Sequence, residues 1–199
     1  ENISMDEPYA AICGISEDEI RSQMKEDVEG LAKKLEVTPE EALMKLKENY
    51  DGYHFTYPSP DIYNPFSLLT AMEKGKIGSY WFGSGTPTYL IKMLDKFGVV
   101  RSEIGKKKAA VEDFDAPTER MTSIIPLLYQ SGYITIKDYD EELDLYTLDI
   151  PNKEVRIGLM KSLLPYYVAS KAPETNTMVA YLSRDIRNGD IDAALRRLQ

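Results

Sequence analysis

Residues Tyr50–Phe55 read YDGYHF, and residues Ile62–Leu69 shortly after them read IYNPFSLL. These two runs hold five aromatic residues and the chain's single histidine, together with glycine and proline, which often mark the boundaries of helices and strands. A stretch this apolar is not an ordinary solvated loop. The pattern predicts a packed segment around which the flanking elements are organised, although it is not in itself a catalytic constellation.

Upstream of this stretch, the sequence predicts two amphipathic helices. Residues Ser16–Glu19 form a capping box, and apolar residues then recur at helical spacing as far as Leu35. Residues Thr38–Glu41 begin a second helix in the same way, and Gly52 is its left-handed stop. We expect the two helices to form an antiparallel pair. Their acidic first turns contain potential metal ligands, but favourable charge at helix N-termini explains these residues without a metal.

Two more helices are predicted from asparagine or threonine followed by proline. Asn64 begins the first, which ends near Gly75, and Thr86 begins the second, which ends at Gly98. Between them, residues Tyr80–Phe82 are the densest aromatic cluster in the chain. Three consecutive aromatic residues cannot all face one core, so some of them should pack against a neighbouring element or a partner.

The next part of the chain predicts a helix, a hairpin and a helix. Apolar spacing predicts a first helix that Pro126 should kink. The β-rich runs 133–137 and 143–148 predict a hairpin, and Asn152 caps the following helix. This order of elements is the one expected of a winged-helix unit. The preceding residues 99–116 are interpreted as a connection.

The charge of the chain argues against direct binding to DNA. Its 24 Lys and Arg residues face 33 Asp and Glu residues, which gives a net charge of −9. The hairpin tip, residues 138–144, is acidic and would be repelled by phosphates. A basic run at 106–108 is interpreted as a solvated flank rather than a phosphate contact. The acidic tip is not a calcium loop either, because Leu143 stands where the glycine of such a loop is needed.

Length and composition indicate an ordinary globular protein. The 199 residues are 43% hydrophobic and 29% charged. The single cysteine, Cys13, excludes an internal disulfide and is expected to be a small buried residue in a reducing compartment. No run is long and apolar enough for a membrane span, so we expect a cytoplasmic location. The chain begins without methionine and ends within a helical pattern, and we therefore expect an excised piece of a larger protein.

Several ordered motifs occur along nearly the whole chain. They are 9–14 (YAAICG), 50–53 (YDGY), 63–69 (YNPFSLL), 80–88 (YWFGSGTPT), 127–133 (LLYQSGY) and 146–155 (YTLDIPNKEV). In these motifs the sequence resembles the predicted AAA-ATPase-like family common in gut Bacteroides-type bacteria. The resemblance implies a parent protein with an N-terminal P-loop ATPase core, the region seen here, and a C-terminal restriction-endonuclease-like nuclease domain.

The sequence departs from that family in what it lacks. No phosphate-binding loop of the pattern G-x-x-x-x-G-K-[ST] occurs in the 199 residues, and no acid–acid–lysine nuclease triad is recognisable. The resemblance therefore implies a mainly α fold without catalytic residues, cofactors or metal ions of its own. The chain is expected to consist of a helical lid-like domain (1–116), a winged-helix-like unit with one β-hairpin (117–170), and a helical linker (171–199) toward a C-terminal domain. ATP and magnesium are implied for the parent protein only.

On this basis the first functional prediction is a regulatory or coupling segment, which links the nucleotide state of an ATPase core to a nuclease-like domain of the same parent chain. The alternative is a protein-interaction scaffold with no nucleotide-linked role. A hydrolase is disfavoured, because no serine or cysteine nucleophile is arranged in the sequence with the single imidazole, His54.

Four residues are predicted to contact the parent's nucleotide when the lid closes. Gly52 permits close backbone approach, and Asn64 with Pro65 opens a helix whose N-terminus favours an anion. His54 lies between them and can respond to phosphate charge. The alternative interpretation is that Gly52 and Asn64 are only helix caps and His54 is only a packed or solvated ring.

Overall fold

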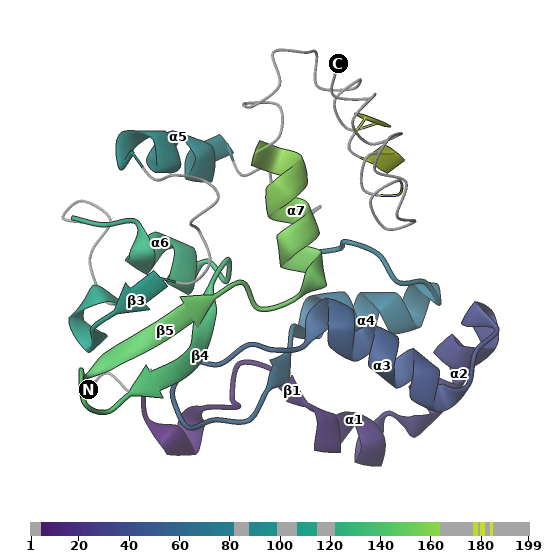
Figure 1. Ribbon diagram of the computed structural model, residues 1–199. Helices are drawn as coiled ribbons and strands as arrows, with labels where there is room; N and C mark the ends of the chain where they lie inside the picture. The colour runs from purple at the N-terminus through teal and green to yellow at the C-terminus, as the bar shows by residue number, and fades with distance from the viewer. Residues whose placement is uncertain are drawn as a thin grey trace. The chain divides into compact units, whose positions relative to one another are not determined.

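The computed structural model describes residues 5–81, 88–98, 107–114 and 122–163, together with five positions between 177 and 184. The chain divides into two compact units, residues 1–156 and 157–199. It is mainly α-helical with two small antiparallel sheets, so the coarse prediction of a mainly α fold is confirmed (Figure 1). The predicted domain boundaries near 116 and 170 lie outside the described residues and stay predictions.

The N-terminal part of the first unit is helical. After a short 3₁₀ turn at Glu7–Tyr9, its helices are α1 (Glu17–Gln23), α2 (Lys25–Leu35), α3 (Pro39–Tyr50) and α4 (Pro65–Lys74). Both predicted capping boxes are present, because the side chains of Ser16 and Thr38 accept from the amides three residues on. The apolar faces of α1–α4 meet in one core. Its buried residues are Ile20, Val28, Leu31, Ala32, Ala42, Leu43, Leu46, Tyr50, Tyr63, Leu68, Ala71 and Met72.

The prediction of one continuous helix from Ser16 to Leu35 is wrong in one respect. At Met24 the backbone leaves the helical region (φ −118°, ψ 25°), so the segment is divided into α1 and α2. The hydrogen bonds from the Met24 amide to Ile20 and from the Val28 amide to Met24 are nevertheless kept. The apolar stripe therefore stays on one face, which is why the spacing pattern does not reveal the break.

A two-stranded antiparallel sheet lies beside this core. Strand β1 (Ile15–Ser16) pairs with β2 (Ile62–Tyr63), and Tyr53 forms an isolated bridge to Ile62. A side chain at Gly14 would collide with Ile62, because an ideal Cβ there lies 2.6 Å from the Ile62 side chain. The sequence-based interpretation did not predict this sheet.

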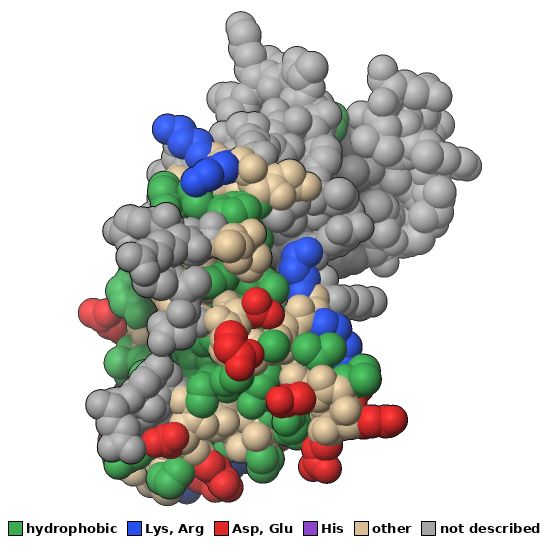
Figure 2. All heavy atoms as spheres, turned by 90° about the vertical axis from the view of Figure 1, so that its left-hand side faces the viewer, with side chains coloured by type: hydrophobic (Ala, Val, Ile, Leu, Met, Phe, Trp, Pro, Cys, Tyr) green, Lys and Arg blue, Asp and Glu red, His purple; other side chains and the backbone are tan. Residues whose placement is uncertain are grey.

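The second sheet has three antiparallel strands in the order β3-β5-β4. Strands β4 (Thr135–Asp140) and β5 (Leu145–Asp149) form the predicted hairpin, which is confirmed. Strand β3 (Lys107–Ala109), followed by a 3₁₀ turn at Val111–Asp113, lies in the segment that was interpreted as a connection. That interpretation is therefore corrected, and the basic run at 106–108 contributes to a strand. Figure 2 shows acidic side chains spread over the lower part of the face that it presents.

The predicted kink at Pro126 is also corrected. Helix α6 (Ile125–Gln130) begins one residue before Pro126, so the proline lies in the first turn, where its missing N–H costs no helical hydrogen bond. The glycine after this helix, Gly132, has a φ of +72°. The chain then turns directly into β4.

Two further helices are α5 (Thr88–Lys96), which precedes Gly98, and α7 (Lys153–Leu163). The predicted start of α5 at Thr86 lies outside the described residues. Asn152 caps α7 as predicted, because its Oδ1 accepts from the Val155 amide at 3.1 Å. In the described part of the chain, no helix combines the length and apolar character needed to cross a bilayer.

Candidate functional site

The organising stretch begins where α3 ends, at Tyr50. The Tyr50 ring is fully buried, and its hydroxyl donates to the Gly78 carbonyl at 2.8 Å and accepts from the Gly78 amide at 2.9 Å. Tyr80 packs beside it, with ring centroids 6.5 Å apart. One buried tyrosine thereby fixes the backbone that leads into the aromatic cluster.

Gly52 approaches another part of the protein closely. Its φ of +90° is one that side-chain-bearing residues rarely adopt, and an ideal Cβ there would lie 2.6 Å from the Pro151 carbonyl oxygen. The ammonium group of Lys137, on β4, donates to the Gly52 carbonyl. Burial lowers the pKa of Lys137. The close approach predicted for Gly52 is thus made to residues of this chain.

Asp51 and Asn152 join the same two regions. The Asn152 side-chain amide donates to the Asp51 carbonyl at 3.0 Å, while its oxygen caps α7. The Asp51 side chain is buried, with Lys47 Nζ at 3.8 Å from Oδ2, and its Oδ1 has no hydrogen-bond partner among the described residues. Burial raises the pKa of Asp51 to about 6.

His54 is attached to the sheet through its backbone. Its N–H donates to the Thr135 hydroxyl at 2.7 Å, and that hydroxyl donates in turn to the His54 carbonyl at 2.6 Å. The ring lies beside Asp61, with 2.6 Å between Nε2 and Oδ1. The other ring nitrogen, Nδ1, is buried and has no partner among the residues that the structure describes.

Glu154, in the first turn of α7, forms hydrogen bonds with the backbone of the aromatic cluster. Its Oε1 accepts from the backbone amides of Tyr80 and Trp81, the latter at 3.0 Å. The Trp81 ring packs on Tyr133, with centroids 5.5 Å apart. The prediction that the aromatic cluster contacts several elements is confirmed for these two residues, whereas Phe82 lies outside the described residues.

Four segments distant in sequence therefore meet in one place within the first unit. We call them the junction, and define it as Tyr50–His54, Gly78–Trp81, Thr135–Lys137 and Pro151–Glu154. In most of the junction's hydrogen bonds, the donor or the acceptor is a backbone atom. Three of the segments overlap motifs named in the sequence analysis, 50–53, 80–88 and 146–155. The junction connects the helical core to the three-stranded sheet.

The four predicted nucleotide contacts do not gather in one cavity. Asn64 caps α4, because its Oδ1 accepts from the Ser67 amide at 3.1 Å, and Pro65 follows in the first turn. Both line a pocket of about 190 Å³. Gly52 and His54 are not among the residues that line this pocket. The role of Asn64 as the cap of α4 is observed, whereas the C-cap of α3 is Asp51 rather than Gly52. Contact of the four residues with nucleotide stays a prediction.

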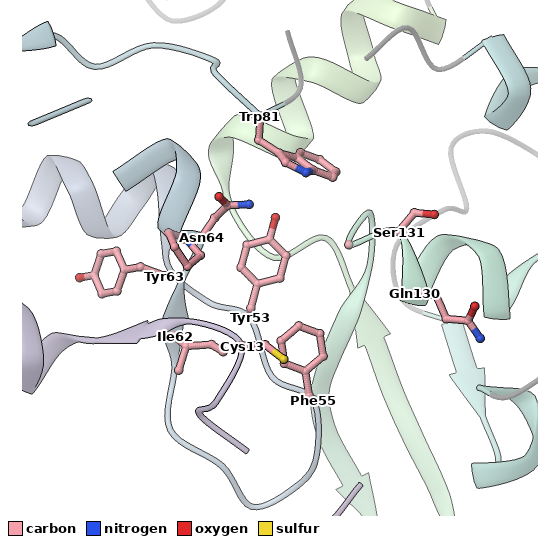
Figure 3. Close-up of a pocket in the computed structure, with 11 residues that line it drawn as sticks. Cys13, Tyr53, Phe55, Ile62, Tyr63, Asn64, Trp81, Gln130 and Ser131 are labelled. Carbon is pink, nitrogen blue, oxygen red and sulfur yellow. The ribbon is translucent and has the colours of Figure 1, made fainter. Parts of the chain in front are cut away.

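The pocket opens between β2, the start of α4 and the turn after α6 (Figure 3). Four of the eleven residues that line it are aromatic, Tyr53, Phe55, Tyr63 and Trp81. Cys13 lies on its wall and is exposed, so the prediction of a buried cysteine is wrong. The sequence-based interpretation missed this pocket. The only signal was the gathering of aromatic residues in the organising stretch.

The acidic residues in the first turns of α1 and α3 form ion pairs and hydrogen bonds with neighbouring residues. Glu17 lies 2.8 Å from both Arg21 and Lys47, which together lower its pKa, and Glu40 lies 2.9 Å from Arg21. Glu19 accepts from Ser16 in its capping box. Within the described residues, no three His, Cys, Asp or Glu side chains are grouped as a metal site would require.

Comparison with known proteins gives one relative of unknown activity. The chain is 29% identical over 177 residues to an Azotobacter chroococcum mcd 1 protein described as "Uncharacterized protein in vnfD 5'region". The alignment covers 86% of this chain and 31% of the relative, so the chain spans about a third of the relative's length. No protein-family model matches the sequence. No solved structure matches it either.

Proposed function

We propose that this chain is a non-catalytic coupling segment of a larger, AAA-ATPase-like protein. In this proposal its helical part acts as a lid on an ATPase core, and its sheet-containing part passes the movement of the lid toward a nuclease-like domain of the same parent. The observation that supports the proposal is the junction. The length of the Azotobacter relative is compatible with a parent that carries further domains.

The junction suits coupling because its bonds span long distances in the sequence. Lys137 and Gly52 are 85 residues apart, and Asn152 and Asp51 are 101 residues apart. If it breaks, the Asn152–Asp51 bond leaves buried polar groups unpaired and the Lys137–Gly52 bond leaves partly buried ones, at a cost of up to about 1–3 kcal/mol each. The helical core and the sheet are therefore expected to move as one body when a force acts on either.

The winged-helix assignment is part of this proposal. Its support is the order of α6, β4 and β5, together with the pairing of β3 on the open edge of β5. On this view the unit begins at about Lys107, ahead of the predicted boundary at residue 117. Because the hairpin tip is acidic and would repel phosphates, we do not expect this unit to bind DNA.

ATP and magnesium belong to the proposed parent. The fit of a phosphate at the start of α4 is poor, because Pro65 has no N–H and the Ser67 N–H is already bonded to Asn64. We therefore derive no step of ATP chemistry from this chain. Contact of Gly52, His54, Asn64 and Pro65 with a nucleotide held by the core stays a proposal.

The coupling proposal predicts that, in the longer parent protein, Lys137→Met separates the response of β3–β5 to nucleotide from the response of the helical part. Addition of a non-hydrolysable ATP analogue should change amide hydrogen exchange in both the helical part and β3–β5 of the unaltered protein. Because the variant removes the donor to Gly52, the response of β3–β5 should decrease while that of the helices persists. The matched control is Lys25→Met, which removes only an exposed ion pair with Glu29 inside α2 and should leave both responses intact.

Absence of any nucleotide response in β3–β5 of the unaltered protein would refute coupling. That outcome would favour the second candidate, a protein-interaction scaffold. The scaffold is supported by exposed apolar residues on α4, where Phe66 and Leu69 are 54% and 48% exposed and lie three positions apart on the helix.

A further prediction concerns the proposed nucleotide contacts. Asn64→Ala should lower the stability by about 1 kcal/mol, through loss of the α4 cap, and should also weaken nucleotide binding by the parent protein. His54→Ala should weaken nucleotide binding as well. Thr38→Ala is the matched control: it removes a cap of the same kind from α3, at similar cost to stability, and should not affect the nucleotide. Unchanged nucleotide affinity in both site variants would leave these residues with structural roles alone.

A further inference from the structure

The pocket beside the junction contains a buried polar group without a partner. Tyr53 is 6% exposed, and its hydroxyl makes no hydrogen bond to any described residue. The side chains of Asn64 and Asn152 lie near enough to oppose the rise in the pKa of Tyr53 that burial causes, but neither meets the distance and angle of a hydrogen bond to its hydroxyl. Leaving such a group unpaired costs free energy, and a ligand that bonds to it would recover that cost.

A second polar group faces the same space. The Asn64 oxygen is used by the α4 cap, so its amide nitrogen is the end available to the pocket. Figure 3 shows this nitrogen and the Tyr53 hydroxyl on the same side of the space beneath the Trp81 ring. A ligand with a hydrogen-bond acceptor at its edge can receive bonds from both.

The residues that line the pocket indicate the shape, charge and size of a suitable ligand. The aromatic faces of Tyr53, Phe55 and Trp81 favour a flat, apolar body. None of the described residues that line the pocket carries a charged side chain, so an ionic group would lose its hydration without compensation. The volume of about 190 Å³ is slightly larger than the cavity of about 150 Å³ that admits benzene in another protein. One ring system therefore fits.

Gly132 shapes the opening. An ideal Cβ at this residue would lie 3.5 Å from the Tyr53 ring and 3.7 Å from the Trp81 ring, so a larger side chain would project between the two aromatic walls. The φ of +72° at Gly132 also favours glycine. The turn after α6 thus keeps this part of the pocket clear.

We propose that this pocket is a binding site for an uncharged heteroaromatic ring, of about the size of a nucleobase, that accepts hydrogen bonds from Tyr53 and Asn64. The proposal goes beyond the coupling function and does not depend on it. It concerns the 199-residue chain alone, without an ATPase core.

The chain offers two site-specific signals for a test. Trp81 is its only tryptophan and Cys13 its only cysteine, and both line the pocket. Adenine should quench Trp81 fluorescence in a saturable manner, with a dissociation constant of millimolar order or lower. At the same concentrations it should slow alkylation of Cys13 by N-ethylmaleimide. Toluene, which has no acceptor, should bind more weakly, and ATP should bind no more tightly than adenosine.

Tyr53→Phe should weaken adenine binding about fivefold to tenfold, because one hydrogen bond is lost while the aromatic wall remains. The variant should fold normally, since the hydroxyl it removes has no hydrogen-bond partner among the described residues. Tyr139→Phe is the control, because it removes a hydroxyl bonded to Asp144 at the hairpin tip. The proposal is overturned if quenching is not saturable, if Cys13 is not protected, if toluene binds as well as adenine, or if Tyr53→Phe binds adenine unchanged.

Discussion

Gly52→Ala is expected to lower the free energy of unfolding by about 3 kcal/mol, which is a large share of the stability of a typical domain. Two costs add in this variant. A non-glycine residue at a φ of +90° costs about 1 kcal/mol or more, and the new methyl group would lie 2.6 Å from the Pro151 carbonyl oxygen. Because that neighbour is backbone, relief requires movement of the junction, at a further cost of about 1–3 kcal/mol.

Alanine substitutions at two other glycines allow the cost of the backbone conformation to be separated from the cost of the steric clash. Gly98 has a φ of +59° with no atom within 4 Å of an ideal Cβ, so Gly98→Ala should show the backbone cost alone, about 1 kcal/mol. Gly30 lies inside α2 with equally open space, so Gly30→Ala should stabilise the protein by roughly 0.5–1 kcal/mol. Urea denaturation measures all three. Equal losses in Gly52→Ala and Gly98→Ala would show that Pro151 does not constrain Gly52.

The features that sequence reasoning predicted correctly depend on residues close together in the chain. A capping box needs two side chains three positions apart, as at Ser16–Glu19 and Thr38–Glu41, and both boxes form. Gly75 adopts the left-handed conformation expected at the end of α4. The β-hairpin was also predictable, because its two strands are adjacent in sequence and separated by a polar turn.

The features that it missed are long-range. Strand β3 pairs with β5 across 37 to 41 positions, Lys107–Ala109 with Tyr146–Leu148, and its own short sequence is charged rather than β-rich. The pairing of β1 with β2 is equally remote, and it places Cys13 at the pocket instead of in a core. Of the four predicted site residues, only Asn64 and Pro65 line that pocket. Gly52 was predicted to approach a nucleotide, which stays a prediction, and sequence periodicity gave no sign of its contact with Pro151.

The second large effect concerns Asp51 and pH. Burial raises its pKa from the ordinary 3.8 to about 6, with Asp61 and Glu17 adding to the rise, and Gly52 and Lys47 opposing it. The unfolded chain therefore loses this proton near pH 4, whereas the folded protein keeps it until about pH 6. Between those values stability falls as pH rises, because only the folded state still binds the proton. A shift of about two units corresponds to roughly 3 kcal/mol.

Asp51→Asn removes this titration and leaves the shape of the side chain nearly unchanged. Relative to the unaltered protein, the variant should gain about 3 kcal/mol in unfolding free energy between pH 4 and pH 7, and the difference should be constant above about pH 6. Lys47→Met should enlarge the pH dependence, since Lys47 is the cation 3.8 Å from the carboxylate. The measurement is denaturation by urea at a series of pH values. A difference between Asp51→Asn and the unaltered protein that does not vary with pH would mean that the Asp51 carboxylate is hydrated in the folded state, and that its burial at the junction is not what determines its charge.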